Sequence, residues 1–199
     1  MNNKDWTGNT KSVFTTIGAS NHSHKIRPAF DFYASPSSII TSLLQKHSIP
    51  HLPIWECAAG ENNLVYPLEQ AGYKVITSDI VQRKVPIDHV EDFLQTKELR
   101  APIVLTNPPY REAKEFILHS IELGAEYVYM FLKTTFLEGQ ERYSDLFSKY
   151  PPKEIWVFSK RVQVALNNNP EEFKKSSAVS YSWFIWEKGF TGSPTIHWL

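Results

Sequence analysis

A strand, a loop, a helix and a second strand follow one another between residues 51 and 79, and this succession constrains the fold more than any other stretch. Residues 51–56 and 73–78 are short apolar runs that predict buried strands, and residues 64–70 predict a helix between them. The unit is about 25 residues long, which suits a right-handed βαβ crossover between parallel strands. The sequence therefore predicts an α/β fold built on a mostly parallel sheet.

The loop of this unit consists of small residues. Ala58, Ala59 and Gly60 allow the backbone to approach a ligand closely, and the helix that follows offers free N–H groups. Asp79 ends the second strand, where an acid in mononucleotide-binding folds accepts hydrogen bonds from ribose hydroxyls. A single glycine disfavours a pyrophosphate ligand and an NAD-dependent oxidoreductase, and it leaves room for a nucleoside. The alternative is an ordinary tight turn, since any α/β protein needs such turns.

A second notable segment is the tetrapeptide Asn107-Pro108-Pro109-Tyr110, which follows the apolar run 101–105. Residues 103–105 predict a buried strand, and two consecutive prolines must end it. Asn107 is then presented at the carboxyl end of a strand, where open α/β sheets bind ligands. The alternative is a simple turn, because Asn-Pro and Pro-Pro are common turn dipeptides.

The spacing of apolar residues predicts the remaining elements. Residues 113–124 predict a helix that ends at a glycine, and residues 127–132 predict a strand with both faces covered by helices. Residues 155–158 and 178–186 predict two strands that pair antiparallel at one edge of the sheet. The expected fold class is therefore α/β, with helices on both faces of a mostly parallel sheet and an antiparallel hairpin at its edge.

Two shorter segments each allow two interpretations. Ser35 is predicted to cap a helix with Pro36 in its first turn, or alternatively to lie with Tyr33 on the wall of a ligand pocket. Asp92 and Phe93 are predicted to close the third strand and flank the base of a ligand, or alternatively to belong to a capped surface segment.

Composition restricts the class of protein. The 199 residues suffice for one core, and the formal net charge of zero provides no global field that would attract nucleic acid. The single cysteine, Cys57, excludes a disulfide framework and fits a reducing, cytoplasmic setting. No apolar run approaches the ~18 residues of a membrane span, so no membrane partner is expected. No metal site is predicted, because His22 and His24 have no further ligands nearby.

The domain organisation follows from these patterns. Residues 1–30 are polar without a sustained period and are expected to form a flexible N-terminal arm. Residues 31–199 are expected to form one domain. Within it, residues 159–178 are expected to form a long loop that contacts the substrate, since loops of this length are uncommon unless they are functional or disordered.

The order of these motifs resembles a known family. Tyr33-Ala-Ser-Pro36, Glu56-Cys-Ala-Ala-Gly60, Asp79 and Asn107-Pro-Pro-Tyr110 occur in the order seen in class I S-adenosylmethionine-dependent methyltransferases that methylate adenine N6. The chain looks most like the small enzymes of this kind from phages and mobile elements. The likeness extends through residues 16–22, 136–140, 158–161 and 183–186. It implies a single Rossmann-like domain.

The resemblance implies roles for individual residues. Glu56 and Gly60 would frame the methionine part of S-adenosylmethionine, Asp79 would hold its ribose, and Asp92 would face its adenine amino group. The complete set of implied cofactor-binding residues is Tyr33, Pro36, Glu56, Ala58, Gly60, Asp79, Ile80, Asp92, Phe93 and Asn107. Ile80 and Phe93 would flank the adenine, and Tyr33 and Pro36 would cover the cofactor. Asn62 and Ser35 stand where the family commonly has glycine and threonine.

The implied catalytic residues are Asn107, Pro108, Pro109 and Tyr110. The side-chain oxygen of Asn107 and the carbonyl of Pro108 would accept hydrogen bonds from the adenine amine, and Tyr110 would stack on the extruded base. DNA is the expected partner, contacted by Tyr110, Lys160 and Arg161. The alternative for Lys160 and Arg161 is a solvated surface, which is the commoner role of scattered charges. RNA adenine, a protein glutamine amide, and a non-catalytic nucleoside-binding or DNA-binding module are the alternatives.

Overall fold

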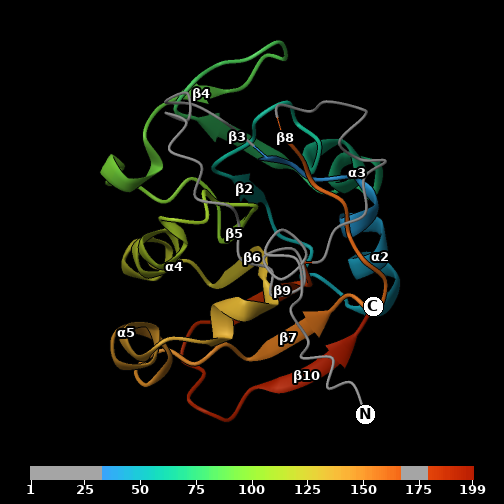
Figure 1. Ribbon diagram of the computed structural model, residues 1–199. Helices are drawn as coiled ribbons and strands as arrows, with labels where there is room; N and C mark the ends of the chain where they lie inside the picture. Colours follow the sequence, from blue (N-terminus) through green and yellow to red (C-terminus); the bar gives the residue numbers. More distant parts are fainter. Residues whose placement is uncertain (1–32, 167–178) are drawn as a thin grey trace, which may run out of the picture.

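The computed structural model describes residues 33–166 and 179–199. The predicted N-terminal arm and most of the predicted loop 159–178 lie outside these residues. The described strands form an eight-stranded sheet in the order β10-β7-β9-β6-β5-β2-β3-β4 (Figure 1). Their bounds are Ile54–Glu56 (β2), Val75–Asp79 (β3), His89–Val90 (β4), Ile103–Thr106 (β5), Tyr127–Lys133 (β6), Glu154–Val157 (β7), Tyr181–Glu187 (β9) and Thr195–Trp198 (β10).

The sheet is mostly parallel, as predicted. Strands β4, β3, β2, β5 and β6 run parallel to one another, and β9 lies antiparallel between β6 and β7. The predicted antiparallel pairing of residues 155–158 with residues 178–186 is therefore confirmed. Strand β10 was not predicted, and it extends the sheet by pairing parallel to β7.

Helices cover both faces of the sheet (Figure 1). The helices are α2 (Ser38–Lys46), α3 (Val65–Gln70), α4 (Ala113–Glu122) and α5 (Gln140–Arg142), together with the short turns η1 (Phe93–Gln95), η2 (Thr134–Leu137) and the π-helical η3 (Tyr143–Phe147). A hydrophobic core lies on each face of the sheet. Alternate residues of β5 contribute to the two cores, because successive side chains of a strand point to opposite faces. Ile103 and Leu105 pack with α2 and α3, whereas Val104 packs with α4.

The start of α2 corrects one prediction. Ser35 was expected to cap this helix, but α2 begins at Ser38, and Ser37 occupies the cap position without a side-chain capping bond. Ser37 Oγ instead donates a hydrogen bond to the carbonyl of Asn63 at 3.0 Å. The segment before α2 therefore crosses to the loop after β2. Its first part, β1 (Tyr33–Ala34), pairs antiparallel with β8 (Ala165–Leu166) in a separate two-stranded sheet.

The third strand ends earlier than expected. Strand β4 consists of His89 and Val90, which pair parallel with the end of β3. Asp92 lies beyond it and begins η1, where its Oδ1 accepts a hydrogen bond from the N–H of Leu94 at 3.0 Å. Within the described ranges, no helix has the length and apolar character needed to cross a membrane.

Candidate active site

The candidate site lies at the carboxyl ends of neighbouring strands. Glu56 ends β2, Asp79 ends β3, and Asn107 directly follows β5. Because these strands are parallel and adjacent in the order β5-β2-β3, the three residues meet at one edge of the sheet. Ligands of open α/β sheets bind at this edge. The fold therefore brings the predicted cofactor and catalytic motifs together.

Asp79 holds the loop after β2 with its side chain. Its Oδ2 accepts a hydrogen bond from the N–H of Gly60 at 2.8 Å, and its Oδ1 accepts one from the N–H of Val81 at 3.1 Å. Ala59 N–H donates to the carbonyl of Ser78 at 3.0 Å, so the loop lies against the end of β3. A carboxylate offers about four lone-pair sites. Asp79 thus retains capacity to accept hydrogen bonds from ligand hydroxyls.

Glu56 is a buried acid beneath this loop. Only 1% of its surface is exposed, and burial raises its pKa to about 8. The hydroxyl of Thr106 and the N–H of Ala58, which donates to Glu56 Oε1 at 3.1 Å, oppose this rise, whereas the nearby Asp79 adds to it. A buried acid in such surroundings is stabilised as the carboxylate only when a cation approaches. Glu56 therefore suits a ligand that carries a positively charged amine.

Two residues of the loop have a left-handed backbone. Gly60 has φ 58° and Asn62 has φ 61°. Asparagine tolerates this region better than most side chains, which accounts for Asn62 in place of glycine. Asn62 Nδ2 donates to the carbonyl of Pro86 at 3.1 Å, whereas its buried Oδ1 accepts no hydrogen bond from the described residues. A buried acceptor of this kind fits a donor supplied by a ligand.

The residues expected to flank an adenine lie in different surroundings. Ile80 follows Asp79 and is 52% exposed, so its side chain is available to cover a planar ring. Asp92 is also exposed and caps η1. Phe93 is only 2% exposed, and its ring packs in the core against Trp55 and Phe116 at centroid distances of 5.0 and 4.8 Å. The ring of Phe93 thus supports the site from inside.

Asn107 is held by the segment before α2. Its Nδ2 donates a hydrogen bond to Ser35 Oγ at 3.0 Å, and Ser35 is buried. This bond orients the amide, because it assigns the nitrogen to the side that faces Ser35 and turns Oδ1 to the opposite side. The interpretation that places Ser35 on a pocket wall is therefore the one that the geometry favours.

The rest of the tetrapeptide turns from β5 into α4. Pro108 is buried, Pro109 is exposed, and the carbonyl of Pro109 accepts a hydrogen bond from the N–H of Glu112 at 3.0 Å. The half-buried Tyr110 ring has the Lys133 ammonium 5.1 Å above its centroid and the Tyr181 ring centroid 6.3 Å away. Tyr110 therefore lies between an aromatic ring and a cation.

A small pocket of about 150 Å³ adjoins Tyr110 and contains residues that sequence reasoning missed. Besides Tyr110, it is lined by Leu132, Lys133, Thr135, Phe136 and Arg142. Arg142 shapes its wall, since its Nε donates to the carbonyl of Phe136 at 2.9 Å and its guanidinium also bonds the carbonyl of Glu138. The sequence feature that could have indicated this pocket is Lys133, because a charged residue ends an otherwise apolar strand that lies parallel to β5.

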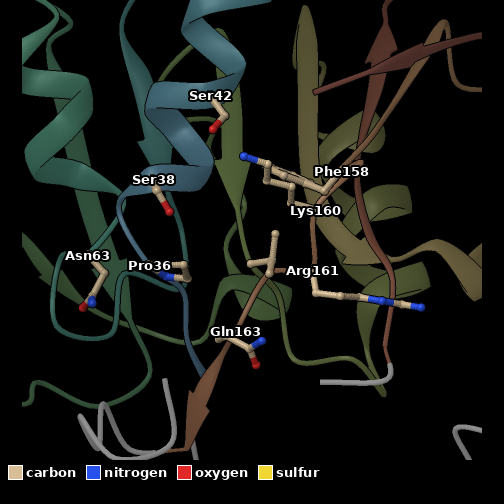
Figure 2. Close-up of a pocket in the computed structure, with 9 residues that line it drawn as sticks. Pro36, Ser38, Ser42, Asn63, Phe158, Lys160, Arg161 and Gln163 are labelled. Atoms are coloured by element: carbon tan, nitrogen blue, oxygen red, sulfur yellow. The ribbon is translucent and has the colours of Figure 1, made fainter. Parts of the chain in front are cut away.

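A larger pocket of about 540 Å³ lies beside α2 and the segment before it (Figure 2). Pro36, Lys160 and Arg161 line it, so a residue predicted to cover the cofactor meets the two cations predicted to contact the substrate. Glu56, Gly60, Asp79 and Asn107 are not among the lining residues. The pocket therefore contains Pro36 and Asn63, which neighbour the predicted cofactor site, but not the acids at the strand ends. The roles assigned to individual residues stay predictions.

The chain was compared with known proteins. No protein-family model and no curated protein matches its sequence. Solved structures do match its fold. A candidate RNA methyltransferase from Pyrococcus horikoshii superposes with a TM-score of 0.55 at 16% identity, over 77% of this chain and 83% of that one.

Two further structures show the same similarity. The 23S rRNA methyltransferase ErmE has a TM-score of 0.51 at 18% identity, over 82% of this chain and 71% of its own. The magnesium protoporphyrin IX methyltransferase of Synechocystis PCC 6803, solved with bound SAM, has a TM-score of 0.51 at 14% identity, over 77% of each chain. The chain therefore has the class I methyltransferase fold.

Proposed function

We propose that this chain is an S-adenosylmethionine-dependent methyltransferase that methylates the N6 amine of adenine in DNA. The observation that carries the proposal is the position of Asn107-Pro108-Pro109-Tyr110 at the carboxyl end of β5, beside the acidic loop of β2 and β3, in a class I methyltransferase fold. The resemblance of the same tetrapeptide to adenine methyltransferases supports the choice of substrate.

The residues around the loop fit S-adenosylmethionine. Glu56 suits the amine of its methionine part, Asp79 has acceptor capacity for the ribose hydroxyls, and Ile80 is exposed beside them for the adenine ring. The buried Oδ1 of Asn62 lies in the same loop and suits a donor. When bound, this cofactor supplies an electrophilic methyl group on a sulfonium.

Asn107 would orient the adenine amine. The lone pair of this amine is delocalised into the ring, so the nitrogen is a poor nucleophile until its geometry becomes tetrahedral. The hydrogen bond from Asn107 Nδ2 to Ser35 presents Oδ1 to accept one N–H, and the carbonyl of Pro108 would accept the other. No strong base is needed before attack, because the amine loses its proton after the methyl group is transferred. Positioning of this kind supplies roughly 7–11 kcal/mol in well-oriented systems.

Tyr110 would hold the extruded base. The target amine is shielded in a duplex, so the nucleotide must leave the stack. Stacking of a base on an aromatic ring contributes about 1–3 kcal/mol. In the structure, the Lys133 ammonium lies over the Tyr110 ring. Because lysine side chains are long and flexible, we expect the incoming base to displace Lys133 at small cost.

RNA adenine is the second candidate substrate. Two structural neighbours are described as RNA methyltransferases, one of them acting on 23S rRNA. The orientation of Asn107 applies to adenine in either nucleic acid, so the same residues would carry the reaction. A methyl-transfer assay with DNA and RNA in parallel distinguishes the two substrates.

The test is transfer of labelled methyl from S-adenosylmethionine to unmethylated DNA, RNA and protein extract in parallel. Asn107→Ala serves as the catalytic control, and Lys74→Gln, an exposed change at the opposite end of β3, serves as the matched control. We expect label in DNA, recovered as N6-methyladenine, with the wild type and Lys74→Gln only.

Label in RNA would retain the mechanism and transfer the assignment to RNA adenine. Label in a protein glutamine would refute the nucleic-acid assignment. If the cofactor binds and none of the three pools is labelled, the proposed function is wrong and a binding module takes its place.

A further inference from the structure

Three parts of the chain line the 540 Å³ pocket (Figure 2). One wall is α2 with the segment before it, the facing wall is the segment that follows β7, and Asn63 comes from the loop between β2 and α3. The lining residues are Pro36, Ser38, Ser42, Asn63, Phe158, Lys160, Arg161, Val162 and Gln163. The volume lies within the range of about 300–1,000 Å³ that is usual for small-molecule sites.

The polar groups of the pocket favour an anion. Ser38 and Ser42 are four residues apart on α2 and therefore lie on one face of the helix. Lys160 points across the pocket toward Ser42, whereas Arg161 extends away from α2 (Figure 2). No aspartate or glutamate lines the pocket. Within the described ranges, Lys160 forms no ion pair.

The pocket also has an apolar wall. Pro36, Phe158 and Val162 line it beside the hydroxyl and ammonium groups. Phe158 is fixed from behind by an edge-on contact with Phe131 at a centroid distance of 5.9 Å. A ligand that combines an anionic group with a less polar ring matches this arrangement. A nucleotide unit of a nucleic-acid strand has this combination.

The backbone connects the pocket to the catalytic asparagine. Ser35 accepts the hydrogen bond from Asn107, and Ser38 lines the pocket three residues later. Three Cα–Cα steps of 3.8 Å span at most about 11 Å. The pocket thus lies close enough to Asn107 for a neighbouring nucleotide of the same strand to enter it.

We propose that this pocket binds the nucleotide next to the target adenine, with its phosphate contacted by Lys160, Ser38 and Ser42. The proposal rests on the proposed function, because it assumes a nucleic-acid substrate. It assigns to α2 a role in substrate binding that its hydrophobic spacing does not indicate. It also explains how a chain with no net charge holds a polyanion, since Lys160 lies across from the serine hydroxyls of α2 in a pocket that no aspartate or glutamate lines.

The test measures binding of a fluorescent DNA duplex of random sequence to the full chain at about 50 to 200 mM salt. The proteins are the wild type, Lys160→Gln, Ser42→Ala and the matched control Lys74→Gln, and binding of S-adenosylhomocysteine to each confirms its folding. Loss of one phosphate contact reduces the slope of log K against log salt by about 0.9. The affinity of the wild type divided by that of Lys160→Gln should therefore fall about 3.5-fold as salt rises from about 50 to 200 mM.

We expect Ser42→Ala to weaken binding with the wild-type slope, and Lys74→Gln to behave as the wild type. Equal affinity and slope for the wild type and Lys160→Gln would overturn the proposal even if DNA is methylated. Conversely, a reduced slope with Lys160→Gln in a protein that transfers no methyl group would support the pocket and refute the proposed function.

Discussion

At the scale of single residues, the bond between Ser35 and Asn107 decides how the candidate catalytic amide points. Ser35 is buried and lies 72 residues from Asn107 in the sequence, so only the fold brings the two together. Without this part-buried bond Asn107 Nδ2 loses the acceptor that orients the amide, and a typical hydrogen bond of this kind contributes about 0.5–1.5 kcal/mol. The orientation of Oδ1 toward a substrate amine would then no longer be fixed.

We expect Ser35→Ala to lower kcat about tenfold or more, because about 1.4 kcal/mol of orientation is lost. Ser35→Thr retains the hydroxyl and should restore kcat to near the wild-type value. Steady-state kinetics with the labelled cofactor measures both, together with KM for the cofactor. A tenfold fall in both variants, or in neither, would contradict the role of the hydroxyl.

Glu56 makes stability depend on pH. Its folded pKa of about 8 lies above its ordinary value of 4.5, so the folded protein retains a proton that the unfolded chain releases. The stability that this retained proton contributes is fully present below pH 4.5 and is lost as pH rises through about 8. We therefore expect the Tm of the ligand-free wild type to fall between pH 5 and 8.5 relative to Glu56→Gln.

Circular dichroism melts of both proteins across this pH range provide the measurement. The wild type should lose stability relative to the variant mainly above pH 5, and the difference should level off above the folded pKa. Two parallel curves would show that Glu56 does not titrate as its burial requires.

At the scale of elements, side-chain bonds attach α2 to the sheet. Beyond the end of α2, His47 Nε2 pairs with the Tyr129 hydroxyl of β6 at 3.0 Å, and its Nδ1 faces Glu154 Oε2 of β7 at 3.2 Å. Burial lowers the pKa of His47, although Glu154 opposes this effect. Trp183 of β9 donates to the carbonyl of Ile39 at 3.2 Å. The helix that bears Ser38 and Ser42 is thus fixed at both ends.

Tyr129→Phe should destabilise this attachment. The variant removes only the hydroxyl and leaves the half-buried Nε2 of His47 without its partner, which costs about 1–3 kcal/mol. Tm should fall by about 2–12 °C for a chain of this size. Tyr66→Phe, at a position 49% exposed, is the matched control and should leave Tm unchanged. Equal Tm values for the two variants would contradict the proposed attachment.

At the scale of the whole molecule, the order of the strands places the ligand site. The edge formed by the carboxyl ends of β5, β2 and β3 carries both the acidic loop and Asn107, so a bound nucleoside cofactor would contact several elements at once. A ligand that binds only the folded state stabilises the entire domain by mass action.

S-adenosylhomocysteine at 100 times its Kd should therefore stabilise the fold by about 2.7 kcal/mol and raise Tm by about 5–11 °C. NAD at the same concentration should not change Tm, because the loop after β2 has one glycine instead of the dinucleotide pattern. Differential scanning fluorimetry compares the two ligands. A shift with NAD alone would refute the cofactor assignment.

Much of the fold follows from local patterns in the sequence. Apolar runs, a loop of small residues and the two prolines after β5 predict the βαβ unit, the strand that ends at Asn107 and the antiparallel pair β7 and β9. The very short β4 has a weak apolar pattern, which explains why its end was predicted at Asp92 and Phe93 instead of Val90. The exposed β10 has an equally weak pattern and was not predicted.

The sequence by itself thus determined the parallel α/β sheet and the position of Asn107 at a strand end, because hydrophobic periodicity and the lack of an N–H in proline act within a few residues. Only the tertiary structure decided that Ser35 bonds Asn107, that Lys133 lies over Tyr110, and that α2 faces the segment after β7. These contacts join residues far apart in the chain. Their geometry depends on strand order and helix packing, which no local pattern encodes.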